Sequence, residues 1–165
     1  MTAAVCALLA ACSSTGNLHP AESTGAPASP AAAQAGSTIQ AETESQRASR
    51  LLSELSKQSV YFDFDDFSLK PQYQDNVKHN ADFMKQSAKD VVTLEGNADE
   101  RGSKEYNLAL GQKRAEAVRK TLVLLGIGDT RIEAISYGAE KPRASCHEEK
   151  CWGEDRRVDF AHKSK

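Results

Sequence analysis

Aromatic residues are missing from the first 60 positions of this 165-residue chain, because all ten lie at or after Tyr61. A packed core, to which such side chains contribute much of the buried area, is therefore excluded from the N-terminal third. An excess of charge of one sign is missing as well: residues 58–165 carry 18 basic and 19 acidic side chains, a net charge of −1. Nucleic acid is excluded as an expected partner, because binding to its phosphate backbone needs a basic surface.

Long apolar runs are also missing. The longest, MTAAVCALLAAC at residues 1–12, is too short to cross a bilayer as a helix, which takes roughly 20 residues. This uncharged run ends in small residues, a pattern typical of the apolar region and cleavage site of a secretory signal peptide. Leu9-Ala10-Ala11-Cys12 also resembles the bacterial lipobox, which is cut just before its cysteine. The sequence predicts a lipoprotein signal peptide over residues 1–11 and lipidation of Cys12.

Large aliphatic residues are scarce in the next segment. Leu18 and Ile39 are the only large aliphatic residues in residues 13–49, and 26 of these 37 residues are Ala, Ser, Thr, Gly or Pro. Such a segment buries too little apolar surface to offset the entropy lost on ordering, so the sequence predicts a flexible tether over residues 12–57. A short helix within residues 44–58 is an alternative for the end of this segment. It would carry leucines at partial helical spacing: Leu51, Leu52 and Leu55.

Residues 58–165 contain alternating strand and helix patterns. Alternating or continuous apolar runs predict strands at residues 60–64, 91–95, 132–136 and 157–160. Apolar or small positions recur every three or four residues over 73–88 and 108–125, which predicts two amphipathic helices, the second with Leu108 and Ala115 in its core stripe. The loop before the last strand leaves room for another helix. The order β-α-β-α-β-(α)-β predicts an α+β fold, with helices packed on a mixed four-stranded sheet in one domain.

One loop and the helix after it hold the candidate binding residues. Residues 96–102, GNADERG, form a charged, glycine-bounded loop between a strand and a helix. Asn107, Leu110 and Arg114 share one face of that helix, and Arg114 leans back toward Asp99 in the loop. An acid and a guanidinium facing one cleft would suit a ligand that bears both an ammonium and a carboxylate. A structural ion pair between Asp99 and Arg114 on a solvated helix face is the alternative.

Five segments together resemble the OmpA-like domain family, in collinear order over about residues 58–162. They are YFDFD at 61–65, GNADERGSKEYN at 96–107, LALGQKRAEAV at 108–118, SYGAEKP at 136–142 and DRRVDF at 155–160. Within that family they are most similar to lipoprotein members of the Tol system, whose layout the lipobox and tether also match.

The resemblance implies non-covalent binding of the peptide stem of peptidoglycan through its meso-diaminopimelate residue. It also implies an outer-membrane lipoprotein that faces the periplasm and tethers the outer membrane to the cell wall. Membership of the Tol system would add roles in envelope integrity and cell division, with the periplasmic propeller protein of that system as a partner. An OmpA-like lipoprotein outside the Tol system is the alternative. An enzyme acting on peptidoglycan is less favoured, because the sequence shows no metal triad, nucleophile elbow or supported carboxylate pair.

By position, the resemblance makes Asp99 the acidic contact and Arg114 the basic contact for the ligand. The family's loop usually has a histidine at the position of Asn97, whose amide still offers a donor and an acceptor. Arg101 and Arg156 match arginines that hold loop and sheet together. Further residues expected to line or shape the pocket are Phe64, Asp65, Asn97, Ala98, Asn107 and Leu110.

Cys146 and Cys151 are predicted to form a disulfide, because an exported protein oxidises such pairs. A zinc site is the alternative, but it needs four ligands and no further cysteine of the folded region is available. We expect the disulfide to act locally, without effect on the pocket, whose residues lie far away in sequence. The sequence predicts no metal and no cofactor, and the scattered histidines, including His162, are interpreted as surface residues.

Overall fold

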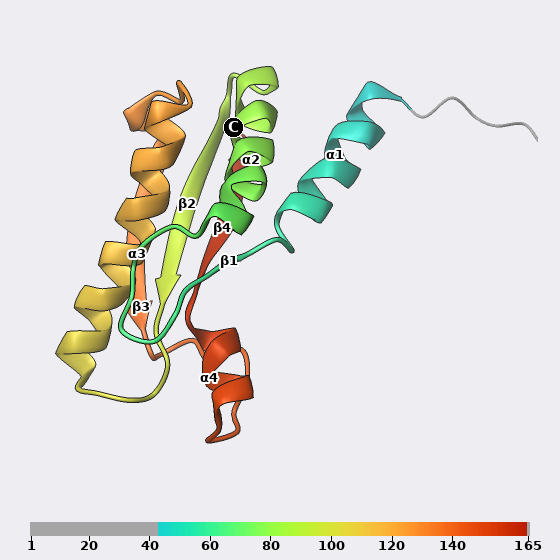
Figure 1. Ribbon diagram of the computed structural model, residues 1–165. Helices are drawn as coiled ribbons and strands as arrows, with labels where there is room; N and C mark the ends of the chain where they lie inside the picture. The colour runs from blue at the N-terminus through green and yellow to red at the C-terminus, as the bar shows by residue number, and fades with distance from the viewer. Residues whose placement is uncertain (1–42, 165) are drawn as a thin grey trace, which may run out of the picture. The chain divides into compact units, whose positions relative to one another are not determined.

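The computed structural model describes residues 43–164, which form a sheet with helices packed on it (Figure 1). The predicted signal peptide, the lipidated Cys12 and the tether before residue 43 lie outside the described residues. Within the described part of the chain, no helix is both long enough and apolar enough to cross a membrane.

The first helix, α1 (Glu44–Leu55), lies where the sequence left a short helix open. It begins with a capping box, in which the Thr43 hydroxyl accepts from the Gln46 N–H and the Gln46 side chain accepts from the Thr43 N–H. Two of the free donors at the start of the helix are thereby satisfied. Leu55 is buried and Leu51 is exposed, so α1 is buried only at its C-terminal end.

Four strands form one sheet in the order β1-β4-β2-β3. β2 (Asp90–Asn97) pairs in parallel with β3 (Ile132–Gly138) and antiparallel with β4 (Arg157–Ser164). β1 (Val60–Tyr61) pairs antiparallel with β4. The predicted mixed four-stranded sheet is confirmed, with β4 and β2 as its central strands.

β1 is shorter than the strand predicted at residues 60–64. Phe62 still donates its N–H to the carbonyl of Arg156 at 2.9 Å, but a turn follows, in which the Asp66 N–H bonds to the Asp63 carbonyl at 3.3 Å. Asp65 in this turn has a φ of 55°. This left-handed conformation is incompatible with a strand, so the chain leaves the sheet after Phe62.

Helices α2 (Gln74–Gln86) and α3 (Lys104–Leu124) pack on one face of the sheet. A 3₁₀ turn at Pro71–Tyr73 leads into α2, and a second one at Asp129–Arg131 precedes β3. The short helix α4 (Glu149–Asp155) lies in the connection from β3 to β4. The core between helices and strands contains Val77, Ala81 and Met84 of α2, Ala115, Val118 and Leu122 of α3, Val92 and Leu94 of β2, and Val158 and Phe160 of β4.

The buried stripe of α3 agrees with the prediction from Gly111 to Leu122, including Ala115, but differs at the start of the helix. Leu108, expected in the core, is 46% exposed, whereas the polar Asn107 is buried. The backbones of α3 and β2 approach closely nearby: a Cβ added to Gly96 of β2 would lie 2.0 Å from the carbonyl oxygen of Gly111. Because only glycine fits there, α3 lies directly on the C-terminal end of β2, beside the loop that follows it.

The interpretation of His162 as a surface residue is wrong. β4 extends to Ser164, and His162 lies on the same face as Val158 and Phe160, with its side chain buried. Its Nδ1 is 2.7 Å from Asp90 Oδ2 and its Nε2 is 2.9 Å from Asn80 Oδ1. The imidazole therefore bridges α2 and the start of β2.

Candidate functional site

A cavity of about 170 Å³ lies at the C-terminal end of β2, where the 96–102 loop meets α3. Three segments line it: the turn after β1, the loop between β2 and α3, and the first three turns of α3. The lining residues are Phe64, Asp65, Ala98, Asp99, Arg101, Gly102, Tyr106, Asn107, Leu110 and Arg114.

Seven of the eight residues expected at the pocket line this cavity, and Asn97 does not. The Asn97 side chain is buried, and its Nδ2 donates to the Glu95 carbonyl at 2.9 Å. Its Oδ1 has no hydrogen-bond partner among residues 43–164. Asn97 therefore shapes the end of β2 but does not face the cavity.

Arg114, in the middle of α3, is fully buried and is held by backbone carbonyls. Its Nε donates to Asp66 at 2.8 Å, its Nη1 to Asn97 at 2.9 Å and its Nη2 to Asp63 at 3.0 Å. These three hydrogen bonds leave two of its five N–H donors without a protein partner. No carboxylate of the described residues forms an ion pair with Arg114. Burial, together with the nearby charge of Arg156, lowers its pKa to about 10, which leaves the guanidinium protonated at neutral pH.

Asp99 is also buried, but it is paired. Arg101 contacts both of its carboxylate oxygens, with Nη2 2.7 Å from Oδ2 and Nε 3.2 Å from Oδ1, and Arg156 Nη1 lies 3.2 Å from Oδ2. Burial raises the pKa of Asp99, but the hydrogen bonds from Arg101 and Arg156 outweigh it, so the pKa lies below its usual value. The alternative of an Asp99–Arg114 ion pair is wrong: the partners of Asp99 are the two arginines expected to hold loop and sheet together.

Sequence reasoning missed three lining residues, Arg101, Gly102 and Tyr106. The Tyr106 hydroxyl donates to the Asp65 carboxylate across the mouth of the cavity, which raises the tyrosine pKa. Tyr106 lies four residues before Leu110 and eight before Arg114, so helical spacing alone could have placed it on this face. Gly102, with a φ of 98°, provides the left-handed turn that leads into α3.

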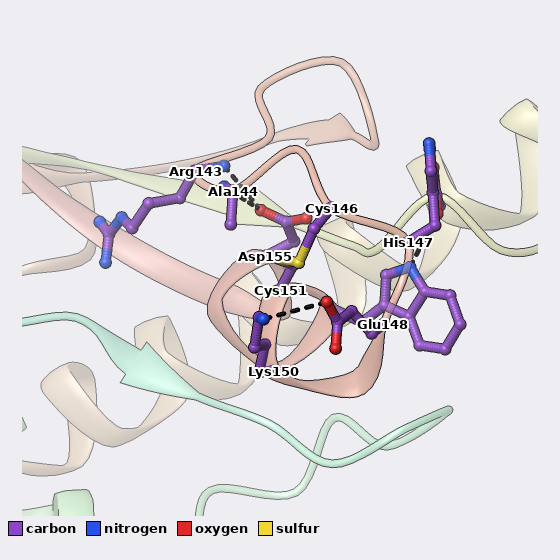
Figure 2. Close-up of a disulfide and its surroundings, with 10 residues drawn as sticks. Arg143, Ala144, Cys146, His147, Glu148, Lys150, Cys151 and Asp155 are labelled. Carbon is purple, nitrogen blue, oxygen red and sulfur yellow. Dashed lines mark hydrogen bonds and ion pairs between the residues drawn. A yellow bond between two sulfur atoms is a disulfide. The ribbon is translucent and has the colours of Figure 1, made fainter.

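The segment before β4 does not line this cavity but contacts Arg101, which does. Cys146 and Cys151 are joined by a disulfide, with their Cα atoms 5.6 Å apart (Figure 2). Asp155, at the end of α4, accepts the backbone N–H groups of Arg143 at 2.6 Å and Ala144 at 3.1 Å, as Figure 2 shows. The connection is therefore held at both ends of α4. Within the described residues, no group of three or more His, Cys, Asp or Glu side chains is placed to hold a metal ion.

The arrangement is suited to binding a small zwitterion. A protonated guanidinium with two free N–H donors can hold a carboxylate bidentately. The carboxylates of Asp99 and Asp65, which line the same cavity, would attract an ammonium. Among the lining residues, the structure contains no cysteine, serine or histidine that could act as a nucleophile or its base.

Comparison with known proteins assigns the domain to a family. The sequence profile of the OmpA family matches residues 61–152, more than half of the chain. A peptidoglycan-associated lipoprotein of Pseudomonas aeruginosa is 44% identical over 102 residues, which cover 62% of this chain and 60% of that protein. One from Mesorhizobium japonicum is 42% identical over 99 residues, covering 60% and 59%. The matched region thus spans about 60% of the length of these curated relatives.

Solved structures share the same fold. The crystal structure of the peptidoglycan-associated lipoprotein from Burkholderia pseudomallei is 51% identical, with a TM-score of 0.63, and the match covers 64% of this chain and 89% of that one. The C-terminal domain of Helicobacter pylori MotB, 16% identical with a TM-score of 0.61, covers 66% and 85% and shares the fold alone. This chain is a member of the OmpA family, with an α+β domain like that of the peptidoglycan-associated lipoproteins.

Proposed function

We propose that this protein is an outer-membrane lipoprotein whose domain binds the peptide stem of peptidoglycan non-covalently, through the free end of meso-diaminopimelate. That end carries an ammonium and a carboxylate on one carbon atom. With the lipid on Cys12 in the outer membrane and the domain on the wall, the protein tethers the two layers. Within the Tol system, with its periplasmic propeller protein as partner, it serves envelope integrity and cell division.

The buried guanidinium of Arg114 is the observation that carries this proposal. A charge taken out of water without a partner of opposite sign destabilises a fold, and three carbonyls only partly compensate Arg114. A ligand carboxylate in the cavity would supply the missing negative charge and accept from the two free N–H donors. The three carbonyl contacts of Arg114 therefore support a role in binding an anion.

Asp99 supports the other half of the ligand. Its low pKa keeps the carboxylate ionised at neutral pH, and Arg101 and Arg156 fix its position. The ammonium of the ligand would share these oxygens with the arginines. Asp65, which is exposed and lines the same cavity, adds a second negative charge at the mouth. The names of the relatives, peptidoglycan-associated lipoproteins, agree with a wall ligand and a lipid anchor.

Sacculi that differ at one residue of the stem test the proposal without any mutation. The purified protein is incubated with sacculi that contain meso-diaminopimelate and with sacculi that contain lysine there. Lysine keeps the ammonium but lacks the carboxylate that Arg114 would hold. We expect co-sedimentation with the first kind only and no release of soluble fragments. Equal sedimentation with both would contradict the assignment of Arg114, and released fragments would indicate an enzyme.

Membership of the Tol system needs a separate experiment. A pull-down of the periplasmic propeller protein by the purified lipoprotein is the expected result. A protein that binds sacculi but does not retain the propeller protein would be an OmpA-like lipoprotein outside that system.

A further inference from the structure

The guanidinium of Arg101 lies between two aromatic rings. Its Cζ is 4.2 Å from the ring centroid of Phe64 and 4.1 Å from that of Trp152. Phe64 lines the cavity, whereas Trp152 comes from α4 and does not. The same guanidinium holds both oxygens of Asp99. Trp152, which lies 53 positions after Asp99 in the sequence, thus contacts the arginine that holds the Asp99 carboxylate.

Two further residues, one at each end of α4, contact Asp99 or Arg101. Arg156, directly after the helix, donates to Asp99, and Glu149, in its first turn, accepts from Arg156 and lies 3.6 Å from Arg101 Nη2. Helix α4 thus holds Arg101 with a ring and a carboxylate, and holds Asp99 through Arg156.

α4 has only seven residues, and a helix this short is not stable by itself. Two constraints hold its N-terminal half. The disulfide ties Cys146 to Cys151, the residue before Trp152 (Figure 2). The carboxylate of Glu100 accepts from Trp152 Nε1 at 2.8 Å and also contacts His147 Nδ1 at 2.7 Å. Both ends of the disulfide-closed loop are thereby fixed against the loop that carries Asp99 and Arg101.

We propose that the disulfide-closed loop, residues 146–151, and Trp152 form a positioning element of the ligand cavity. By holding Arg101 between Trp152 and Phe64, this element keeps the Asp99 carboxylate in its binding geometry before the ligand arrives. Affinity for the peptide stem therefore depends on a disulfide whose cysteines do not line the cavity. This role rests on the proposed function. It replaces the expectation that the disulfide acts only locally, because residues distant in sequence are neighbours in the fold.

The experiment compares three variants with the wild type in the full chain: Trp152→Ala, Trp152→Phe and the double variant Cys146→Ser/Cys151→Ser. Calorimetry measures binding of the tripeptide L-Ala-γ-D-Glu-meso-diaminopimelate. Mass spectrometry after alkylation without reductant establishes that the wild type contains the disulfide, and circular dichroism establishes that each variant is folded. Trp152→Phe is the matched control, because it keeps a ring for Arg101 and loses only the hydrogen bond to Glu100.

We expect Trp152→Ala and the double cysteine variant to bind the tripeptide about tenfold more weakly, the size of one lost cation–π contact in a partly desolvated site. Trp152→Phe should retain most of the affinity. The Nε–H resonance of Arg101, shifted by the two rings in the wild type, should move toward its solvent value in the two weak variants. This readout needs no ligand and would not respond to a loss of stability alone.

The outcomes separate the two proposals. A wild type that fails to bind the tripeptide overturns the proposed function and, with it, the dependence of affinity on the disulfide. A wild type that binds, together with folded variants that bind equally well and leave the Arg101 resonance unchanged, overturns only the positioning role. Equal weakening in Trp152→Phe and Trp152→Ala overturns the stacking contact as its basis.

Discussion

Asp99 and Arg114 line the same cavity but do not pair with each other: two arginines hold the carboxylate, and three backbone carbonyls hold the guanidinium. Each charge is thus fixed independently of the other. A site of this kind keeps both charges available, because neither has to leave the other before a ligand enters. The separation excludes a structural ion pair between the two residues and supports the proposed binding site.

Replacing Arg114 should affect both binding and folding. Arg114→Ala leaves three backbone carbonyls without their donor, and a buried polar group left unsatisfied typically lowers the free energy of unfolding by about 1 to 3 kcal/mol. Arg114→Lys is the cleaner test, because it keeps the charge and loses the planar fork. We expect this variant to remain folded by circular dichroism and to lose co-sedimentation with diaminopimelate-containing sacculi. Wild-type sedimentation by Arg114→Lys would mean that the fork does not contact the ligand.

Asp99 should make the stability of the domain depend on pH at the acid end. Its pKa is lowered in the folded state, so its stabilising contribution is fully present above the unfolded-state pKa and is lost as the pH falls through the folded-state value. Asp99→Asn should lower the free energy of unfolding by about 2 kcal/mol at pH 7, the scale of a hydrogen bond to a charged group. The difference between variant and wild type should shrink below about pH 4, the unperturbed range of an aspartate. Urea unfolding at several pH values measures it, and a difference independent of pH would refute the ion pairs with Arg101 and Arg156.

The anchor can be tested in cells. Cys12→Ser removes the proposed site of lipidation, and because stable membrane attachment depends on acyl chains, we expect the variant in the soluble periplasmic fraction. The wild type should fractionate with the outer membrane. A Cys12→Ser variant that remains in the membrane fraction of cells lacking the wall and propeller partners would contradict lipidation at this residue.

Removing His162 should destabilise the domain without affecting the ligand. His162→Ala leaves the buried Asp90 carboxylate, whose Oδ1 already lacks a partner among the described residues, without its imidazole. A buried polar group left without its hydrogen-bond partner typically costs about 1 to 3 kcal/mol. The double variant His162→Ala/Asp90→Ala should recover part of this stability, because no unpaired carboxyl group then remains buried. Thermal melts compare the two, and a single variant as stable as the wild type would show that the hydrogen bonds of His162 do not stabilise the fold.

The sequence was informative where the spacing of residues along one helix or strand determines which face they share. The helical spacing of Asn107, Leu110 and Arg114 placed these residues on one face, and glycine-bounded loop residues joined them at the cavity. The same method placed Leu108 in the core, because a hydrophobicity pattern cannot anticipate a buried polar residue. Asn107 is buried because its Nδ2 donates to the Asp99 carbonyl at 3.0 Å, a contact made only after the loop has folded.

Contacts between distant segments were beyond the reach of local patterns. No periodicity links Trp152 to Arg101, and their stacking follows from the path of the connection between β3 and β4. His162 is different, since it continues the alternation of Val158 and Phe160 by one more step. Extending the last predicted strand by one such step would have placed it in the interior.

The strand order also governs when the domain can fold. β4 is the last of the strands in residues 43–164 but lies between β1 and β2, and β1 pairs with no other strand of the described residues. A chain made from its N-terminus therefore cannot complete the sheet until β4 has been made, and such non-local pairing is slow. The sheet therefore assembles only after β4 has been made, and until then β1 has no strand to pair with among the described residues.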